Sequence, residues 1–216
     1  TQHPFFVEFE WVSNSRNLDT ELPSKNTIWQ TNEKILTPQN PITLFWTNND
    51  NITFKINFKI DDNYMFDVIQ EVNNQSNKSL NFYPRQTIKR IYKPKTTDFF
   101  ISHEGLISNI NDRLYEKKYK TLKKECDQNS YKIIDGNKIS QQDQDCNQVT
   151  NNAWLGFTDK YWMSILIPNS EKTFGTNFQY YNNDREIYIV RYHDDFNNVI
   201  QPNTKHKFGG KVFAGA

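Results

Sequence analysis

The feature that most constrains the fold is a strict alternation of apolar and polar residues between Ile52 and Ile60. The apolar positions are Ile52, Phe54, Ile56, Phe58 and Ile60. Successive residues of a β-strand point to opposite faces, whereas an α-helix would bring apolar residues together every three to four positions. The segment therefore predicts a strand with one buried face in an antiparallel sheet.

Similar apolar or aromatic runs recur along the chain, separated by polar turns. They cover Phe5–Val12, Ile42–Thr47, Tyr64–Val72, Leu80–Ile91, Trp154–Phe157, Met163–Ile167, Phe174–Tyr181, Glu186–Tyr192 and Lys205–Phe213. The segment Asp112–Glu125 is ambiguous, because it fits either a short helix or a strand that ends in a charged turn. About ten short strands with little helical periodicity indicate a mainly β protein of the β-sandwich type.

Turns in this chain must be made largely without glycine. The 216 residues include only 7 Gly, whereas Asn and Asp cluster between the apolar runs, as in Asn48–Asn51, Asp61–Asn63 and Asn182–Asp184. Asn and Asp tolerate positive φ angles and hydrogen-bond the nearby backbone, so they can replace glycine in turns.

Composition and charge exclude several classes of protein. Aromatic residues make up 15% of the chain, which indicates a packed core rather than disorder. The 26 Lys and Arg nearly balance the 25 Asp and Glu, so no excess positive field favours nucleic acid. No stretch approaches the roughly 18–20 apolar residues of a spanning helix. The length fits a single domain, residues 1–216.

The segment 126–152 is polar and is predicted to be a long excursion from the sheet. Its Cys126 and Cys146 are the only cysteines, and their spacing excludes a CxxC redox or zinc motif. In an extracytoplasmic protein they could form a disulfide that closes this loop. Two unrelated free thiols are the alternative.

No residue pattern predicts catalysis, a cofactor or a metal. Phosphate-binding glycine motifs and nucleophile or zinc-protease motifs are absent from the sequence. Histidines adjoin carboxylates only at His103–Glu104 and His193–Asp195, where surface or turn positions are the favoured interpretation. The basic run Lys117–Lys124 could contact acidic lipids or nucleic acid, but flanking Glu116 and Glu125 favour a solvated face.

The densest aromatic segment is Trp154–Pro168, with the sequence WLGFTDKYWMSILIP. Its aromatic residues, which could line a groove or fill the core, are Trp154, Phe157, Tyr161 and Trp162. Trp and Tyr make good binding surfaces, but the apolar run Met163–Ile167 is typical of a buried strand. The core is therefore the favoured interpretation, with Thr158–Lys160 as an exposed turn.

This segment resembles the hallmark region of the large periplasmic domain in the YidC family of bacterial membrane protein insertases. Other stretches are similar to that family in the same order, especially to its alphaproteobacterial members. They are Pro4–Val12, Leu36–Trp46, Phe100–Ile107 and Lys211–Ala216. Together these motifs span nearly the whole chain.

The resemblance implies a β-supersandwich of the galactose-mutarotase-like type, on the periplasmic side of the inner membrane and tethered there by transmembrane helices outside this chain. It implies a non-catalytic interaction module of a protein that inserts and helps fold membrane proteins, alone or with the Sec translocon. The implied partners are that translocon, its SecDF accessory complex and, through the parent protein, nascent membrane proteins.

The chain also departs from the family pattern. The family has strands before the position of Thr1, so N-terminal strands are expected to be missing here and Phe5–Val12 is expected at a sheet edge. The excursion 126–152 is longer and more polar than usual. Two alternatives stay open at this point: a carbohydrate-binding or aldose-epimerase-like sandwich, which needs His103, His193 and an acid in one cleft, and a secreted structural β-domain.

Overall fold

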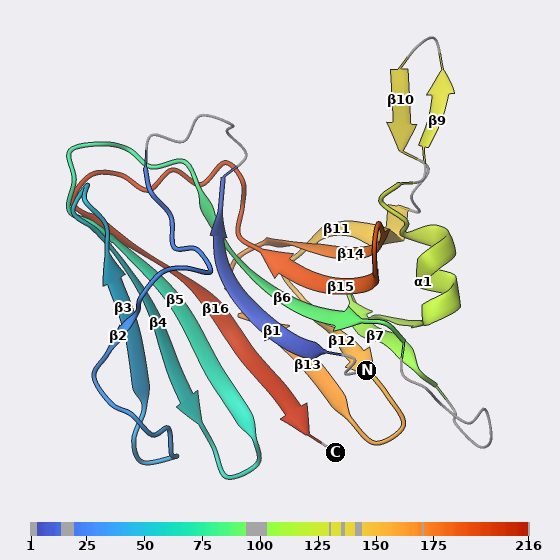
Figure 1. The fold of residues 1–216 in the computed structure, drawn as a ribbon, viewed down its shortest axis with the longest axis horizontal. Helices are drawn as coiled ribbons and strands as arrows, with labels where there is room; N and C mark the ends of the chain where they lie inside the picture. Colours follow the sequence, from blue (N-terminus) through green and yellow to red (C-terminus); the bar gives the residue numbers. More distant parts are fainter. Residues whose placement is uncertain are drawn as a thin grey trace. The chain divides into compact units, whose positions relative to one another are not determined.

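The computed structural model describes residues 4–13, 20–93, 103–129, 131–134, 137–140, 144–169 and 171–215. Within these ranges the chain is mainly antiparallel β-structure with one α-helix, α1 (Tyr119–Glu125), and one 3₁₀ helix, η1 (Gln144–Cys146) (Figure 1). The described residues group into two compact units. The first unit lies within Thr1–Glu8, Thr87–Tyr192 and Ala214–Ala216, and the second within Phe9–Gln86 and His193–Phe213.

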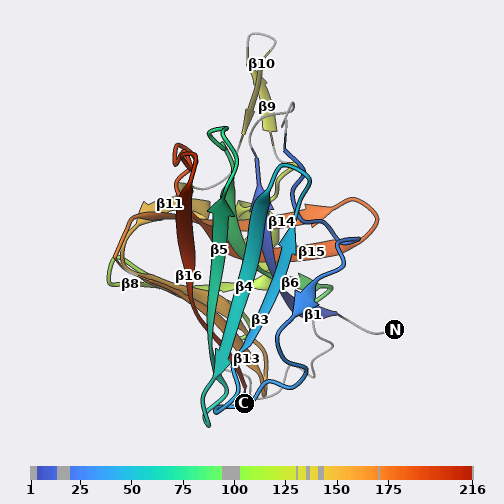
Figure 2. The ribbon, with the colours of Figure 1, turned by 90° about the vertical axis from the view of Figure 1, so that its left-hand side faces the viewer.

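The second unit is built on a twisted antiparallel sheet. Its strands, in spatial order, are β2 (Gln30–Thr31), β3 (Ile42–Thr47), β4 (Ile52–Ile60), β5 (Met65–Asn74) and β16 (Thr204–Gly215). Figure 2 shows β3, β4, β5 and β16 side by side. The predicted alternation of β4 is confirmed, because Ile52, Phe54 and Ile56 are buried while Lys59 is exposed.

Aromatic rings fill the core of the second unit. The Phe54 ring lies 5.1 Å from Trp11, 5.7 Å from Trp46 and 5.6 Å from Phe82, measured between centroids. Trp11 belongs to β1 (Phe5–Val12), which pairs with β6 (Tyr83–Ile91) at the edge of its sheet. Burial of such side chains, worth roughly 25 cal/mol per Å² of apolar surface, is what holds strands of this polar sequence together.

The first unit contains two groups of strands. In one group, neighbouring strands pair in the order β13 (Met163–Pro168), β12 (Ala153–Thr158), β7 (Gly105–Ile110) and β8 (Arg113–Lys118). The other contains β15 (Glu186–His193), β14 (Phe174–Asn182) and β11 (Asn147–Thr150). Its core is rich in tyrosine: Tyr119 lies 5.8 Å from Phe157 and 4.8 Å from Tyr188 between ring centroids.

The ambiguous segment Asp112–Glu125 contains both predicted alternatives in succession. Strand β8 ends at Lys118 and helix α1 begins at Tyr119 without an intervening loop. Tyr119 and Leu122, one turn apart, are the buried residues of the helix. Two apolar side chains on one face are enough to dock so short a helix, but they give too little periodicity to be recognised in the sequence.

The polar excursion is more ordered than its composition suggests. β9 (Tyr131–Ile134) and β10 (Asn137–Ser140) form a hairpin that extends away from the rest of the first unit (Figure 1). β11 then adds to β14 in antiparallel register. Cys126 and Cys146 are joined by a disulfide, with the Cα atoms 5.8 Å apart, and this bond links the end of α1 to η1.

Asn and Asp make many of the turns, as the composition predicts. Among non-glycine residues of the described ranges, positive φ angles fall on Asn51, Asn111, Asp112 and Asn203 as well as on two tyrosines, Tyr64 and Tyr92. The Asn48 side chain accepts hydrogen bonds from the backbone N–H groups of Asp50 and Ile52, both at 3.0 Å. Such side-chain bonds satisfy the turn backbone without glycine.

Candidate functional site

The aromatic turn, residues 159–162 between β12 and β13, carries the two most exposed aromatic side chains among the described residues of the first unit. The backbone N–H of Asp159 donates to the carbonyl oxygen of Trp162 at 2.8 Å and closes the turn. Tyr161 is 69% exposed and Trp162 is 60% exposed. The Lys160 ammonium lies 5.0 Å from the centroid of the Tyr161 ring, within cation–π range.

The base of this turn is anchored in the interior. Asp159 forms an ion pair with Arg90 at 3.0 Å, and the two side chains are only 12% and 11% exposed. Its other carboxylate oxygen accepts a hydrogen bond from the Tyr119 hydroxyl at 2.8 Å. Burial and the neighbouring Asp159 carboxylate raise the pKa of Tyr119, so the phenol stays protonated and donates. The exposed residues Tyr161 and Trp162, the tip of the turn, therefore follow a residue that is held in place by Arg90 and Tyr119.

The outer face of the sheet β13–β12–β7–β8 is half-exposed and mainly apolar. Register pairs Gly156 with Ile165 and with Ile107, so these residues share a face with Trp154 and Met163. The side chains of Ile107, Trp154, Met163 and Ile165 are each partly exposed. A Cβ atom at Gly156 would collide with the carbonyl oxygen of Ser164, so glycine allows β12 and β13 to approach closely.

A shallow hollow of about 390 Å³ adjoins the aromatic turn. It is lined by Thr158, Asp159, Lys160, Tyr161, Trp162, Met163 and Gly215. Its lining offers ring faces and a thioether together with one cation, while the Asp159 carboxylate is already paired with Arg90. Such a lining suits an amphipathic group better than a compact polar substrate.

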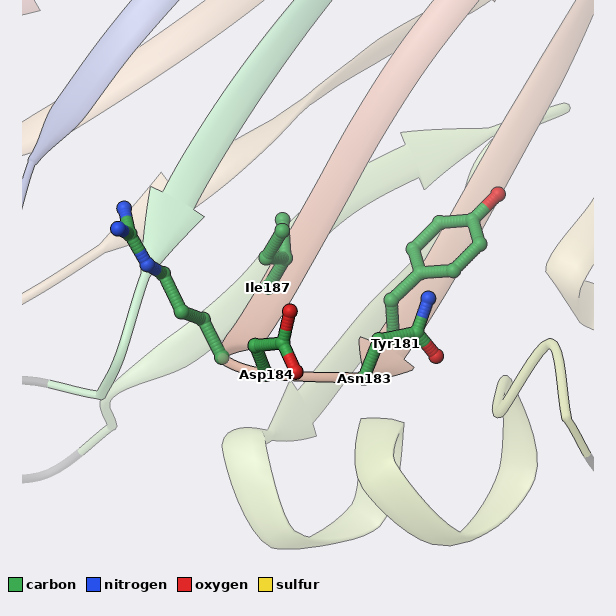
Figure 3. A pocket seen from close by; sticks show the side chains of 5 residues that line it. Tyr181, Asn183, Asp184 and Ile187 are labelled. Atoms are coloured by element: carbon green, nitrogen blue, oxygen red, sulfur yellow. The ribbon is translucent and has the colours of Figure 1, made fainter.

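A second hollow of about 380 Å³ lies at the turn between β14 and β15. Tyr181, Asn183, Asp184, Arg185 and Ile187 line it, and Figure 3 shows the Tyr181 hydroxyl directed away from the Asp184 carboxylate. The adjacent Glu186 accepts a hydrogen bond from Lys123 at 2.6 Å, which lowers the pKa of that carboxyl. The polar groups at this turn do not converge on a common point.

In the second unit, the sequence gives no advance signal for a buried His–Asp pair. His206 Nε2 lies 2.5 Å from the Asp194 carboxylate, and Asn198 donates to the same oxygen at 3.0 Å. Burial alone would raise the pKa of Asp194, but the hydrogen bonds from His206 and Asn198 outweigh burial and lower it. The Asp194–His206 pair connects the loop after β15 to β16, and we interpret it as a structural clasp that holds this loop on the strand.

The sequence-predicted aromatic residues separate into different environments. Phe157 is fully buried and packs on Tyr119 and on Phe5, whose ring centroid is 6.4 Å away. Trp154 is half-buried on the outer face. Tyr161 and Trp162 are exposed, so the favoured core interpretation does not describe these two: the exposed turn extends past Lys160 to Trp162.

The histidines considered for epimerase chemistry have local partners. His103 Nε2 lies 2.7 Å from the carbonyl oxygen of Leu106 in the first unit. In the second unit His193 Nδ1 lies 2.7 Å from the carbonyl oxygen of Asp194. Within the described ranges, no three His, Cys, Asp or Glu side chains gather in a way that could hold a metal ion.

Comparison with solved structures defines the class of fold. A galactose mutarotase related enzyme from Lactobacillus acidophilus aligns over 89% of this chain and 72% of its own, with a TM-score of 0.52 and 13% identity. A galactose mutarotase-like protein from Lactobacillus casei aligns over 98% of this chain and 84% of its own, with a TM-score of 0.52 and 10% identity. The chain has a galactose-mutarotase-like β-sandwich fold; at such identities the likeness concerns the fold alone.

Sequence comparison identifies the family within that class. The sequence model of the YidC periplasmic domain matches residues 1–216. The membrane protein insertases YidC of Rickettsia bellii and Rickettsia prowazekii are 32% and 33% identical over 219 residues, covering 100% of this chain. The chain belongs to the YidC periplasmic domain family. It spans 35% of the length of these relatives.

No helix in the ranges that the structure covers is both long and apolar enough to cross a membrane.

Proposed function

We propose that this chain is the periplasmic part of a larger inner-membrane insertase that inserts and helps fold membrane proteins. The observation that carries the proposal is the family match over residues 1–216, supported by the relatives named membrane protein insertase YidC. Residues 1–216 act as one domain in this proposal, with the excursion 126–152 as an addition. The domain is a non-catalytic interaction module, tethered to the membrane by helices of the parent protein.

The proposed partners are the Sec translocon and its SecDF accessory complex, with nascent membrane proteins reached through the parent. The outer face of β13–β12–β7–β8 supports such a role, because Trp154, Ile107 and Ile165 leave apolar surface accessible on a sheet. Contiguous apolar surface on a folded domain is typical of protein interaction sites.

One face of the sheet in the second unit carries charged side chains. Cross-strand register places Lys55 opposite Glu71, and Glu71 pairs with Lys207 at 3.4 Å. On the same face, four residues earlier in β5, Asp67 pairs with Lys211 at 2.8 Å. Because this face carries charged rather than apolar side chains, Lys55 provides a control position for the apolar face.

The test uses the full-length parent protein with a photo-crosslinking residue at Ile165 or at Lys55, expressed in cells. The proposal expects crosslinks to a subunit of the Sec translocon or SecDF from position 165 and none from position 55. Equal crosslinking from both positions, or none from 165 in correctly inserted protein, would count against this face as the partner surface.

Epimerase activity is the second candidate function, because the fold is galactose-mutarotase-like. The arrangement of the histidines does not support this chemistry. Epimerisation needs an acid and a base converging on one sugar, whereas His103 and His193 each contact a nearby backbone carbonyl oxygen, of Leu106 and Asp194 respectively. Polarimetry with common aldoses should show mutarotation at the uncatalysed rate. Saturable acceleration that a His103→Ala or His193→Ala variant abolishes would restore this alternative.

A further inference from the structure

We infer that one end of the sheet β13–β12–β7–β8 is a contact surface for the interface of an anionic lipid bilayer. The surface consists of the aromatic turn, residues 159–162, together with Lys118 and Lys120. This inference rests on the proposed function, because it assumes a domain held close to a membrane, and it names a lipid surface as a further partner.

The chemistry of the aromatic turn suits the lipid headgroup region. Tyr161 and Trp162 are 69% and 60% exposed, although leaving large rings in water is costly. Both side chains join an apolar ring to a polar N–H or O–H group, which is why Trp and Tyr gather at membrane interfaces. Lys160 stands beside them and can reach lipid phosphates while its stem follows the Tyr161 ring.

Strand register brings part of the basic run to the same end. Thr158 pairs with Met163 and with Gly105, and Gly105 pairs with Lys118, so one row across four strands ends at this lysine. The aromatic turn connects Thr158 to Met163, and α1 begins directly after Lys118. The Tyr119–Asp159 hydrogen bond of 2.8 Å fixes the start of α1 against the base of the turn.

The charges at this end favour an anionic surface. Lys118 and Lys120 are exposed, and no ion pair joins either of them to a carboxylate among the described residues. By contrast, Lys117 pairs with Glu125 and Lys123 with Glu186, both at 2.6 Å. Asp159 is neutralised by Arg90. Glu104, next to Gly105, opposes the lysines in part.

The hollow of about 390 Å³ beside the aromatic turn adds a concave apolar surface to which a lipid group could bind. Gly215, the last residue of β16 and part of the first unit, lines it together with Trp162 and Met163. Because the turn is anchored through Arg90 and Tyr119, its rings need no folding transition to enter a bilayer, which limits the entropic cost of binding.

The test measures co-sedimentation of the 216-residue chain with vesicles of phosphatidylcholine mixed with phosphatidylglycerol, and with phosphatidylcholine alone. The chain should bind the mixed vesicles more tightly, and added salt should weaken that binding. Replacing Tyr161 and Trp162 together by Ala should lower the partition coefficient about tenfold, because the interfacial rings are lost. Lys118→Gln and Lys160→Gln should remove the preference for phosphatidylglycerol.

Leu114→Ala is the control for the loss of exposed apolar side chains, and Lys172→Gln is the control for the loss of lysine charge. Leu114, 55% exposed, lies at the opposite end of the same sheet, and Lys172 follows the far end of β13. Leu114→Ala and Lys172→Gln should leave vesicle binding unchanged, and circular dichroism should confirm the fold of every variant. Brominated lipids should quench Trp fluorescence in the unsubstituted chain but less in Trp162→Phe.

Failure to bind either vesicle, or equal losses in the test and control variants, would overturn the inference. A concentration-dependent dimer abolished by the Tyr161 and Trp162 changes, without vesicle binding, would instead assign the surface to a second copy of this chain. These results do not measure insertion or Sec contacts, so the proposed function stands or fails separately.

Discussion

Arg90 and Asp159 form a nearly buried ion pair that joins β6 to the turn between β12 and β13. The atoms Arg90 Nη2 and Asp159 Oδ2 are 3.0 Å apart. Arg90 also lies over the Phe5 ring, 5.1 Å from its centroid. Through one side chain Arg90 thus joins β6 to β1 and to the base of the exposed aromatic turn.

Arg90→Ala should destabilise the domain by about 3 kcal/mol, because it leaves a buried carboxylate without its cation. Urea unfolding followed by circular dichroism measures the loss. Lys211→Ala provides the control, since Lys211 and Asp67 are each about half exposed and such surface pairs contribute about 0–1 kcal/mol. Equal effects of the two substitutions would contradict the proposed anchor.

Phe157→Ala and Trp162→Ala should differ sharply in their effect on stability. Phe157 is fully buried, so its truncation should cost about 3–5 kcal/mol through lost burial and a cavity. Trp162 is mostly exposed, and its truncation should cost less than about 1 kcal/mol. A loss at Trp162 as large as that at Phe157 would place the Trp162 ring in the core.

Asp194 makes the stability of the second unit depend on acid pH. Its pKa is lowered from 3.8 in the folded chain, so its stabilising contribution is complete above pH 3.8 and is lost as the pH falls through the folded value. Asp194→Asn should weaken the unfolding free energy by about 1–3 kcal/mol at neutral pH, because the bond to His206 loses its charge.

The same variant should flatten the pH dependence of stability below pH 3.8, which denaturant unfolding at several acidic pH values would show. Asp195→Asn is the neighbouring control, because the Asp195 carboxylate accepts hydrogen bonds from the backbone N–H and the side-chain amide of nearby Asn197. If Asp194→Asn leaves the pH dependence of the unfolding free energy unchanged below pH 3.8, the Asp194–His206 pair is not its cause.

The Cys126–Cys146 disulfide should be present in protein folded in an oxidising compartment. Thiol titration of denatured, unreduced protein should find no free thiol. Reduction should lower the free energy of unfolding by about 3 kcal/mol, because the bond closes a loop with a sequence separation of 20. Two titratable thiols per chain would show that the bond does not form.

The regular strands were predictable from local pattern. The alternation in Ile52–Ile60 coincides with β4, because one buried face imposes a period of two on the residues. The apolar runs Phe5–Val12 and Ile42–Thr47 coincide with β1 and β3. The polar strands β9, β10 and β11 have no such period, so nothing in their composition distinguishes them from loop.

The candidate site was less predictable because its contacts are not local. Trp154–Pro168 stood out by composition, but the sequence does not show where a strand ends and an exposed turn begins, and Trp162 fits either. The pairs Arg90–Asp159 and Asp194–His206 join distant segments or flank a loop, and each partner is an ordinary charged residue in sequence. Only the folded topology brings them together.

The central claim is that this chain is an interaction module of an insertase rather than its insertion machinery. The most direct test deletes residues 1–216 from the full-length parent, keeps its membrane-spanning parts, and measures insertion of a model membrane protein in cells depleted of other insertases. The account predicts that much of the insertion activity persists at normal membrane levels of the parent. Complete loss of insertion at normal levels would contradict it.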